Sequence, residues 1–227
     1  MFGALAFFDM DGTLVAGDCG VLFALFCARH GLLTLGELGA MAAWVGRAAV
    51  RGVKEAEVVE AKRMLLRFRM RLGEARSDAL YEECFASDLR PRLRADVRAE
   101  LESAKAAGPV FIVTANLRGL AVRIGGELGV PAERCLGAEP VRDARGALTG
   151  DVHQPIPVGE ERARLVRAIA AREGVPLEEV RAFGDSLHDV PMLRAAGKPC
   201  AVHAGRRLRV LAAREGWRTL PASPPGC

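Results

Sequence analysis

Short runs of apolar residues alternate with longer amphipathic stretches over most of the chain. The apolar runs contain no polar alternation, which is typical of strands buried on both faces of a parallel sheet. They lie at residues 4–8, 109–113, 180–183 and 199–202. The stretches of helical period lie at residues 94–107, 117–128, 160–173 and 206–215. Strands that alternate with helices predict an α/β fold with a doubly wound, Rossmann-like parallel sheet.

A small hairpin is expected within this pattern. The sequence RDARGALTGD at 142–151 places Gly146 where a turn is needed. Residues 148–152 would form the returning strand.

The stretch from 19 to 88 breaks the alternation, because it contains no convincing strand. It is expected to form successive helices separated by Gly31 and Gly73. Its middle helix would carry an apolar face and a basic face, which consist of Val58, Ala61, Leu65, Phe68 and Leu72, and of Arg63, Arg67 and Arg71. The sequence therefore predicts a helical cap domain at 16–90, inserted into a catalytic core formed by 1–15 and 91–220. The tail, PASPPGC at 221–227, is expected to be disordered.

Composition limits the classes of protein that fit. Of 227 residues, half are apolar, which is enough for a compact domain with a smaller insertion. The net charge of +4 is too mild to indicate nucleic-acid binding. No apolar run is long enough to cross a bilayer, and the N-terminal residues lack the basic region of a signal peptide. Six scattered cysteines without metal-type spacing favour reduced thiols and a cytoplasmic location. No stable membrane association is expected.

The strongest chemical signal is Asp9-Met10-Asp11-Gly12-Thr13, directly after the first apolar run. Ligands of open α/β sheets bind at the carboxyl ends of strands, and acids two residues apart in extended chain point the same way. Gly12 allows a sharp turn behind them. Two close carboxylates repel unless a cation relieves them, and Mg²⁺ prefers such oxygen ligands. An EF-hand loop is excluded, because Gly12 is the fourth residue of the motif and not the sixth.

A second acidic motif, GDSLHD at 184–189, follows the apolar run 180–183 and adds Asp185 and Asp189. The letters GDSL also spell the nucleophile motif of one esterase family. That interpretation fits poorly, because the motif lies late in the chain and no acid after it has a histidine three residues on. Ser186 would therefore lack a base. His188 is assigned no role.

Together these motifs resemble the haloacid dehalogenase superfamily, and specifically its phosphoserine-phosphatase-like branch (subfamily IB) with a small helical cap. The resemblance spans nearly the whole chain. DMDGT at 9–13 matches the first motif, Thr114 the second and GDSLHD the fourth. LTGDV at 148–152 and AAREGW at 212–217 are also similar to stretches of that branch.

The resemblance implies a Mg²⁺-dependent phosphatase that hydrolyses a small phosphomonoester. Asp9 would be the nucleophile and form an aspartyl-phosphate, while Asp11 would act as general acid and then as general base. Mg²⁺ would be held by Asp9, the backbone carbonyl of Asp11 and Asp185, with Asp189 in support. Thr114 would donate a hydrogen bond to a phosphoryl oxygen. Relatives that cleave carbon–halogen bonds or pump ions lack an acid at the place of Asp11, so a phosphatase is favoured.

The chain departs from the family pattern at two places. The family's third motif is a lysine, and Arg162 occupies that position, with Arg164 and Arg167 as alternative cations nearby. Phosphoserine phosphatases typically have DxDST and a glutamate nine residues after the nucleophile, where this chain has Gly12 and Asp18. Gly12, Thr114, Arg162 and Asp18 are thus the expected phosphate- and substrate-binding residues. Asp18 could equally be the N-cap of the following helix.

Two other functions compete with this interpretation. One is a catalytically silent member that uses its cap to bind a partner. The other is a phosphatase that acts on a lipid head-group phosphate, which the basic face Arg63, Arg67 and Arg71 suggests. A solvated helix side is the more ordinary explanation of that face.

Overall fold

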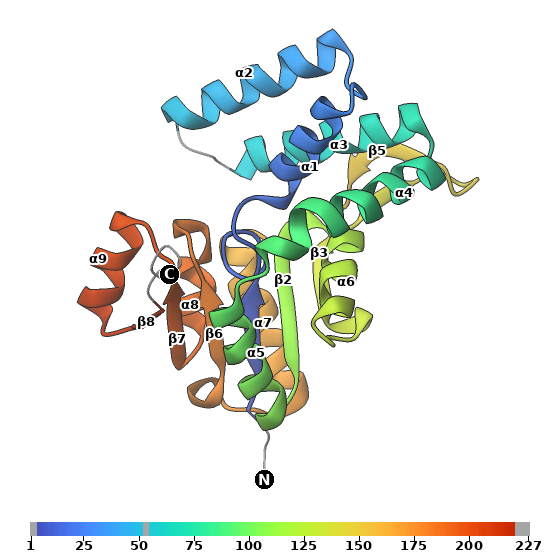
Figure 1. Cartoon of the computed structure of the whole chain (residues 1–227). Helices are drawn as coiled ribbons and strands as arrows, with labels where there is room; N and C mark the ends of the chain where they lie inside the picture. The colour runs from blue at the N-terminus through green and yellow to red at the C-terminus, as the bar shows by residue number, and fades with distance from the viewer. Residues whose placement is uncertain (1–3, 52–54, 221–227) are drawn as a thin grey trace.

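A six-stranded parallel sheet forms the centre of the protein (Figure 1). The computed structural model describes residues 4–51 and 55–220. The strand order is β3-β2-β1-β6-β7-β8. The strands are β1 (Ala6–Asp9), β2 (Val110–Leu117), β3 (Cys135–Ala138), β6 (Arg181–Gly184), β7 (Lys198–Val202) and β8 (Arg218–Leu220). This arrangement confirms the predicted α/β fold.

The register of the central strands brings the predicted motifs together. β1 pairs with β2 so that Asp9 lies opposite Val113, and it pairs with β6 so that Phe8 lies opposite Phe183. Because these strands are parallel, their carboxyl ends meet at one edge of the sheet. Asp9, Thr114 and Asp185 therefore lie at the same edge, although they are far apart in the sequence.

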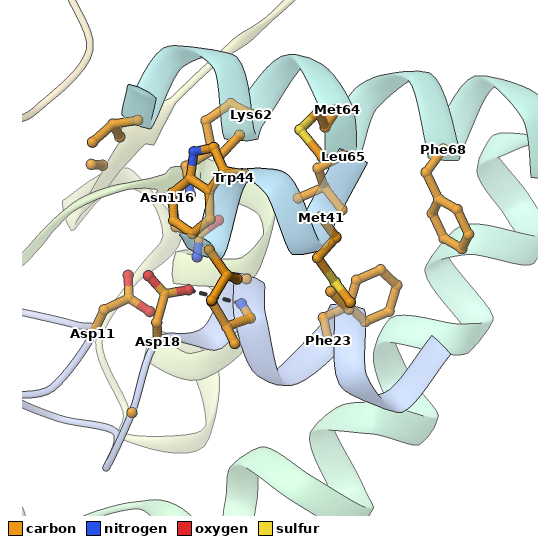
Figure 2. A pocket seen from close by; sticks show the side chains of 18 of the residues that line it. Asp11, Asp18, Phe23, Met41, Trp44, Lys62, Met64, Leu65, Phe68 and Asn116 are labelled. Atoms are coloured by element: carbon orange, nitrogen blue, oxygen red, sulfur yellow. Dashed lines mark hydrogen bonds between the residues drawn. The ribbon is translucent and has the colours of Figure 1, made fainter. Parts of the chain in front are cut away.

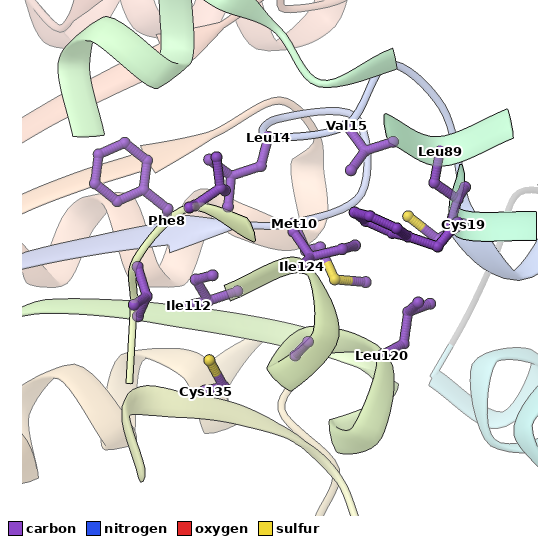
Figure 3. Close-up of a cluster of buried hydrophobic side chains, with 14 of the residues drawn as sticks. Phe8, Met10, Leu14, Val15, Cys19, Leu89, Ile112, Leu120, Ile124 and Cys135 are labelled. Atoms are coloured by element: carbon purple, nitrogen blue, oxygen red, sulfur yellow. The ribbon is translucent and has the colours of Figure 1, made fainter. Parts of the chain in front are cut away.

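Helices cover both faces of the sheet, as expected for strands with continuous apolar runs. One face packs against α5 (Ala95–Ala107) and α6 (Arg118–Glu127), and Figure 3 shows part of this cluster around Phe8 and Ile112. The other face packs against α7 (Glu160–Glu173), α8 (Val190–Ala195) and α9 (Arg206–Glu215). Phe8 belongs to the first cluster and its neighbour Phe7 to the second, so consecutive residues of β1 point to opposite layers.

The segment after β1 forms helices, as predicted. These are α1 (Cys19–Arg29), α2 (Leu35–Arg51), α3 (Glu55–Leu72) and α4 (Glu74–Cys84), followed by short π and 3-10 turns at Phe85–Leu89 and Arg90–Arg92. Figure 1 shows α1, α2 and α3 beyond the end of the sheet that lies opposite the N-terminus. They are thus placed over the carboxyl ends of the strands.

The predicted hairpin is present as β4 (Pro140–Arg142) and β5 (Leu148–Val152), an antiparallel pair that contacts α3. The predicted basic face of α3 is partly neutralised. Arg63 lies 3.0 Å from a carboxylate oxygen of Asp151 on β5, and Arg71 lies 2.9 Å from Glu37 on α2. Two of its three arginines therefore hold neighbouring elements in place.

Among the described α-helices and strands, β3, β8 and α8 were not predicted from the sequence. The tail at 221–227 lies outside the described residues, so its expected disorder stays a prediction. Over the described part of the chain, no helix is both long and apolar enough to cross a membrane. The five described cysteines are buried and form no disulfide with one another.

Candidate active site

Asp9 ends β1 and is almost fully buried, with 2% of its surface exposed. Its Oδ1 lies 2.7 Å from Nη1 of Arg162. Burial and the neighbouring carboxylate of Asp189 raise the pKa of Asp9 well above its ordinary value, although Arg162 acts in the opposite direction. A carboxyl group placed here is poorly hydrated and surrounded by other acids, so the ionised form of Asp9 needs a further cation nearby, in addition to Arg162.

Asp11 is held by two donors from different parts of the chain. The backbone N–H of Cys19 donates to Oδ1 at 2.7 Å, and Oγ1 of Thr114 donates to Oδ2 at 3.0 Å. Burial and the charge of Asp18 raise the pKa of Asp11, while Lys62 lowers it. A carboxyl group with a raised pKa is suited to alternate between acid and base near neutral pH.

Thr114 itself is fully buried, and its Oγ1 also accepts a hydrogen bond from the backbone N–H of Asn116 at 3.0 Å. The sequence suggested a hydrogen bond from Thr114 to a phosphoryl oxygen. In the structure that hydroxyl donates to Asp11, and its contact with a phosphoryl oxygen stays a prediction.

Gly12 has a φ of +83°, a conformation that side chains rarely adopt. A Cβ at this position would collide with the carboxylate of Asp185, so only glycine allows the two motifs to meet. Its N–H points back into the loop, where it lies 2.9 Å from the carbonyl oxygen of Val15 and 3.0 Å from that of Gly17. Gly12 therefore shapes the loop here, and its expected role in binding phosphate stays a prediction.

The second acidic motif turns tightly behind the nucleophile. Oδ2 of Asp189 accepts hydrogen bonds from the backbone N–H groups of Asp185 and Ser186, at 3.1 and 2.9 Å, and from the Ser186 hydroxyl at 2.8 Å. The hydroxyl of Ser186 is thus bonded to a carboxylate and not to a histidine, which disfavours the esterase interpretation. Asp189 in turn fixes the loop that carries Asp185.

Ligand atoms of Asp9, Asp185 and Asp189 all lie within 4.8 Å of one another. Burial and the neighbouring Asp189 raise the pKa of Asp185 to about 7. Three crowded acids of this kind fit a hard divalent cation with oxygen ligands. Since both oxygens of Asp189 already accept hydrogen bonds, Asp9 and Asp185 are the better placed to contact an ion directly.

Arg162 lies in the first turn of α7 and is 95% buried. Its Nε donates to the carbonyl oxygen of Pro157 at 3.0 Å, and its Nη1 contacts both Asp9 and Asp189. Arg164, one of the two alternative cations, is exposed and pairs with Glu161, and the other, Arg167, is also exposed. Of these three arginines, only Arg162 reaches Asp9.

Asp18 lies both at the start of α1 and at the cavity, which are the two positions that the sequence analysis considered. It is the N-cap of α1, where its Oδ1 accepts from the N–H of Val21 at 2.9 Å, and it lines the cavity above Asp11. Its side chain is nevertheless exposed.

Two polar residues beside Asp11 were missed by the sequence analysis. Lys62 on α3 is 7% exposed, and Asn116 at the end of β2 is 1% exposed. Both line the same cavity as Asp9 and Asp11 (Figure 2). The available signal was that Lys62 is one of only four lysines in a chain with 28 arginines.

Comparisons with known proteins agree with this geometry. The family model for haloacid dehalogenase-like hydrolases matches residues 6–194. Phosphoserine phosphatase SerB1 of Mycobacterium tuberculosis (strain ATCC 25618 / H37Rv) is 33% identical over 94% of this chain and 69% of its own length. The probable phosphatase Rv3661 of the same strain is 28% identical over 97% of this chain and 76% of its own length.

Solved structures share the fold. A protein of unknown function from Bordetella pertussis Tohama I has a TM-score of 0.84 at 23% identity, covering 97% of this chain and 99% of its own. A phospho-aspartyl intermediate analogue of phosphoserine phosphatase has a TM-score of 0.66 at 18% identity, covering 98% and 95%. The chain therefore belongs to the haloacid dehalogenase-like hydrolase family, in its phosphoserine-phosphatase-like branch.

Proposed function

We propose that the protein is a Mg²⁺-dependent phosphatase that hydrolyses a small phosphomonoester through an aspartyl-phosphate on Asp9. The observation that carries this proposal is the pair at the end of β1. Asp9 lies among the acidic cluster and Arg162, while Asp11, two residues on, is held by Thr114 and Cys19. The names of the relatives, which include phosphatases, support the same class of phosphoric monoester hydrolase.

The reaction would proceed in two displacements. A carboxylate oxygen of Asp9 attacks phosphorus, and the bond to the alcohol oxygen breaks as Asp11 donates a proton to it. Asp11 then removes a proton from water, which attacks the same phosphorus and releases inorganic phosphate from Asp9. The raised pKa of Asp11 suits this exchange, because the group must begin protonated.

Positive charge is needed where phosphate meets these acids. Arg162 on α7 supplies one cation, and Lys62 on α3 supplies another. Bound Mg²⁺ would neutralise phosphoryl oxygens from a site made by Asp9, Asp185 and the backbone carbonyl of Asp11, with Asp189 behind them. The cap, residues 16–90, would close over the substrate and exclude water.

The test is phosphate release with and without Mg²⁺, in the parent and in Asp9→Asn. Activity is expected to need Mg²⁺ and to vanish in Asp9→Asn, which keeps the shape but removes the attacking charge. Beryllium fluoride, which mimics an acyl phosphate on a carboxylate, is expected to inhibit. Undiminished turnover by Asp9→Asn would eliminate the covalent mechanism, and Mg²⁺ binding without turnover of any ester would favour a silent binding domain.

The Asp11→Asn variant tests the role of general acid separately from that of nucleophile. Alkyl phosphates have poor leaving groups that need a proton, whereas aryl phosphates need it much less. The variant is therefore expected to lose far more activity on ethyl phosphate than on an aryl phosphate. Equal losses on both would argue against Asp11 as the acid.

A further inference from the structure

One cavity of about 580 Å³ extends from the candidate nucleophile into the space between α1, α2 and α3. Asp9 and Asp11 line its inner end, and Phe23, Met41 and Phe68 line the region farther along (Figure 2). Its volume lies within the range that holds drug-sized ligands. A leaving group the size of serine would fill only the part nearest the acids.

The inner part of this cavity contains Lys62 and Asn116, and the amide nitrogen of Asn116 lacks a partner. Among the described residues, no carboxylate lies within ion-pair distance of the buried Lys62, and the buried amide nitrogen of Asn116 has no hydrogen-bond partner. The Nζ of Lys62 and the amide nitrogen of Asn116 both lie close to Gly20 and to Asp18 (Figure 2). Buried polar groups are normally paired, so the unpaired amide of Asn116, with the cation of Lys62 nearby, is ready to bind a polar segment of a ligand.

The outer part of the cavity is mainly apolar, although Glu37 and Arg67 also line the cavity. Met41, Leu65 and Phe68 lie along it in Figure 2, whereas Trp44 lies nearer Asn116. The one polar atom of the Trp44 side chain already donates to the carbonyl oxygen of Glu57 at 3.0 Å, so its ring offers carbon to the cavity. Methionine and aromatic side chains of this kind adapt to flexible apolar ligands.

Helix α2, which contributes Met41 and Trp44, is also apolar on the side away from the cavity. It carries no charged residue from Leu38 to Gly46. Leu35 is 88% exposed, and Val45, which also lines the cavity, is 47% exposed. An apolar chain that enters past α2 would therefore meet little polar surface on its way.

We propose that the substrate is the phosphomonoester of an alcohol that carries a single apolar chain. Its phosphate lies at Asp9, its polar linkage beside Lys62 and Asn116, and its chain between α1, α2 and α3. This proposal rests on the proposed phosphatase function and names the substrate class of that site. A compact polar substrate would leave the apolar wall facing water.

The experiment measures kcat/KM for ethyl, butyl, hexyl and octyl phosphate as dissolved monomers, with phosphoserine alongside. Burial of a methylene is worth about 0.8 kcal/mol, which is about fourfold per methylene at most. We expect kcat/KM to rise by about two- to fourfold per methylene and to exceed that of phosphoserine.

Outcomes separate this proposal from the one on which it rests. A flat series with ready hydrolysis of ethyl phosphate and phosphoserine overturns the apolar-chain proposal and leaves the phosphatase intact. No hydrolysis of any ester overturns both. Turnover of a long-chain lysophosphatidate from phosphatidylcholine vesicles would identify a membrane lipid as the substrate. Turnover of esters only when they are dissolved in solution would identify a free ester.

Two substitutions of alanine by phenylalanine test where the apolar chain of the substrate lies. Ala61 lines the cavity from α3, whereas Ala79 is exposed on α4 and lies outside it. Ala61→Phe is expected to lower the ratio of octyl to ethyl phosphate kcat/KM at least tenfold, and Ala79→Phe to leave that ratio unchanged. An unchanged ratio in a folded Ala61→Phe would overturn the proposal. Met41→Gln, which makes the same wall polar, serves as the test if Ala61→Phe melts early.

Discussion

Arg162 illustrates how one side chain can serve both stability and chemistry. Its guanidinium is fixed by Pro157 and lies against Asp9 and Asp189, so a buried cation balances part of a buried acidic cluster. A guanidinium is a planar fork, whereas the lysine of related enzymes is a compact point charge. Nη1 contacts both carboxylates while Nε donates to Pro157, so two nitrogens of the planar group fix the direction in which its charge points.

Arg162→Ala is expected to reduce kcat/KM by roughly 100-fold or more, because it removes a cation beside the attacking group. Arg162→Lys should retain measurable activity, because the charge remains. Arg162→Ala will also lose stability, since a buried carboxylate left without its partner is costly. Steady-state kinetics with a thermal melt for each variant separate the two effects. Arg164→Ala is the matched control, and the assignment fails if that variant loses activity while Arg162→Ala does not.

Lys62→Met is expected to shift the pH dependence as well as the rate. Lys62 lowers the pKa of Asp11, so its removal should raise that pKa. Asp11 would then stay protonated to higher pH, and the basic limb of the kcat/KM profile should move upward. Lys105→Met, at a distant surface ion pair with Glu102, should leave the profile unchanged. A slower Lys62→Met enzyme with an unmoved basic limb would show that Lys62 does not act on Asp11.

At the scale of single residues, the sequence predicted the site residues whose positions depend only on the strand that precedes them. Asp9, Asp11 and Asp185 follow apolar runs directly, and strand ends alone bring them together. Lys62 and Asn116 could not be found this way, because their burial depends on how α3 packs over the end of β2. No local pattern distinguishes a buried lysine on an amphipathic helix from an exposed one.

Among the elements, the central strands were predictable and the edge strands were not. β1 is apolar up to Asp9 and β2 is apolar up to Thr114, because helices cover both of their faces. β3 is only CLGA, and β8 is RTL, with two exposed polar residues. Such short edge strands exist because a neighbour supplies their hydrogen bonds, and their side chains carry little periodicity.

The edge strand β8 is tied to α5 by charge, which gives a prediction for stability. Arg218 on β8 and Arg181 on β6 both pair with Glu100 on α5. Glu100→Gln is expected to reduce the free energy of unfolding by about 1–2 kcal/mol at neutral pH. Glu102→Gln, on the same helix but more exposed, should cost less.

The sign of the pH dependence follows from the direction of the shift. Hydrogen bonds and charge from Arg218, together with Arg181, lower the pKa of Glu100 in the folded protein. Its contribution is therefore present above the ordinary glutamate pKa and is lost as pH falls through the lower, folded value. Urea titrations should show the gap between parent and Glu100→Gln closing below about pH 4. A gap that persists there would mean that the variant acts through packing.

At the scale of the whole molecule, the doubly wound core could be predicted because its pattern is repeated in each strand and helix. The cavity could not. It is formed by side chains of α1, α2 and α3 together with the loop after β1, and its size depends on how the helices pack over the sheet. An apolar helix face predicts burial against a neighbour, but not whether a gap is left between them.

Mg²⁺ should stabilise the whole protein, and more strongly as pH rises. In the metal-free protein, burial and neighbouring acids raise the pKa of Asp9 well above normal and that of Asp185 to about 7. Between about pH 4 and pH 7 the unfolded chain has lost protons that the folded chain retains, so stability falls as pH rises through this window. A divalent cation offsets the charge that causes the loss.

We therefore expect Mg²⁺ to raise the melting temperature only slightly at pH 5 and by roughly 5 °C or more at pH 8. Differential scanning calorimetry with Mg²⁺ or with a chelator measures both values. Asp185→Asn is the matched variant. Without Mg²⁺ it should be more stable than the parent at pH 8, because one repelling charge is gone, and Mg²⁺ should stabilise it less. Equal stabilisation by Mg²⁺ at both pH values, or an undiminished effect in Asp185→Asn, would place the ion elsewhere on the molecule.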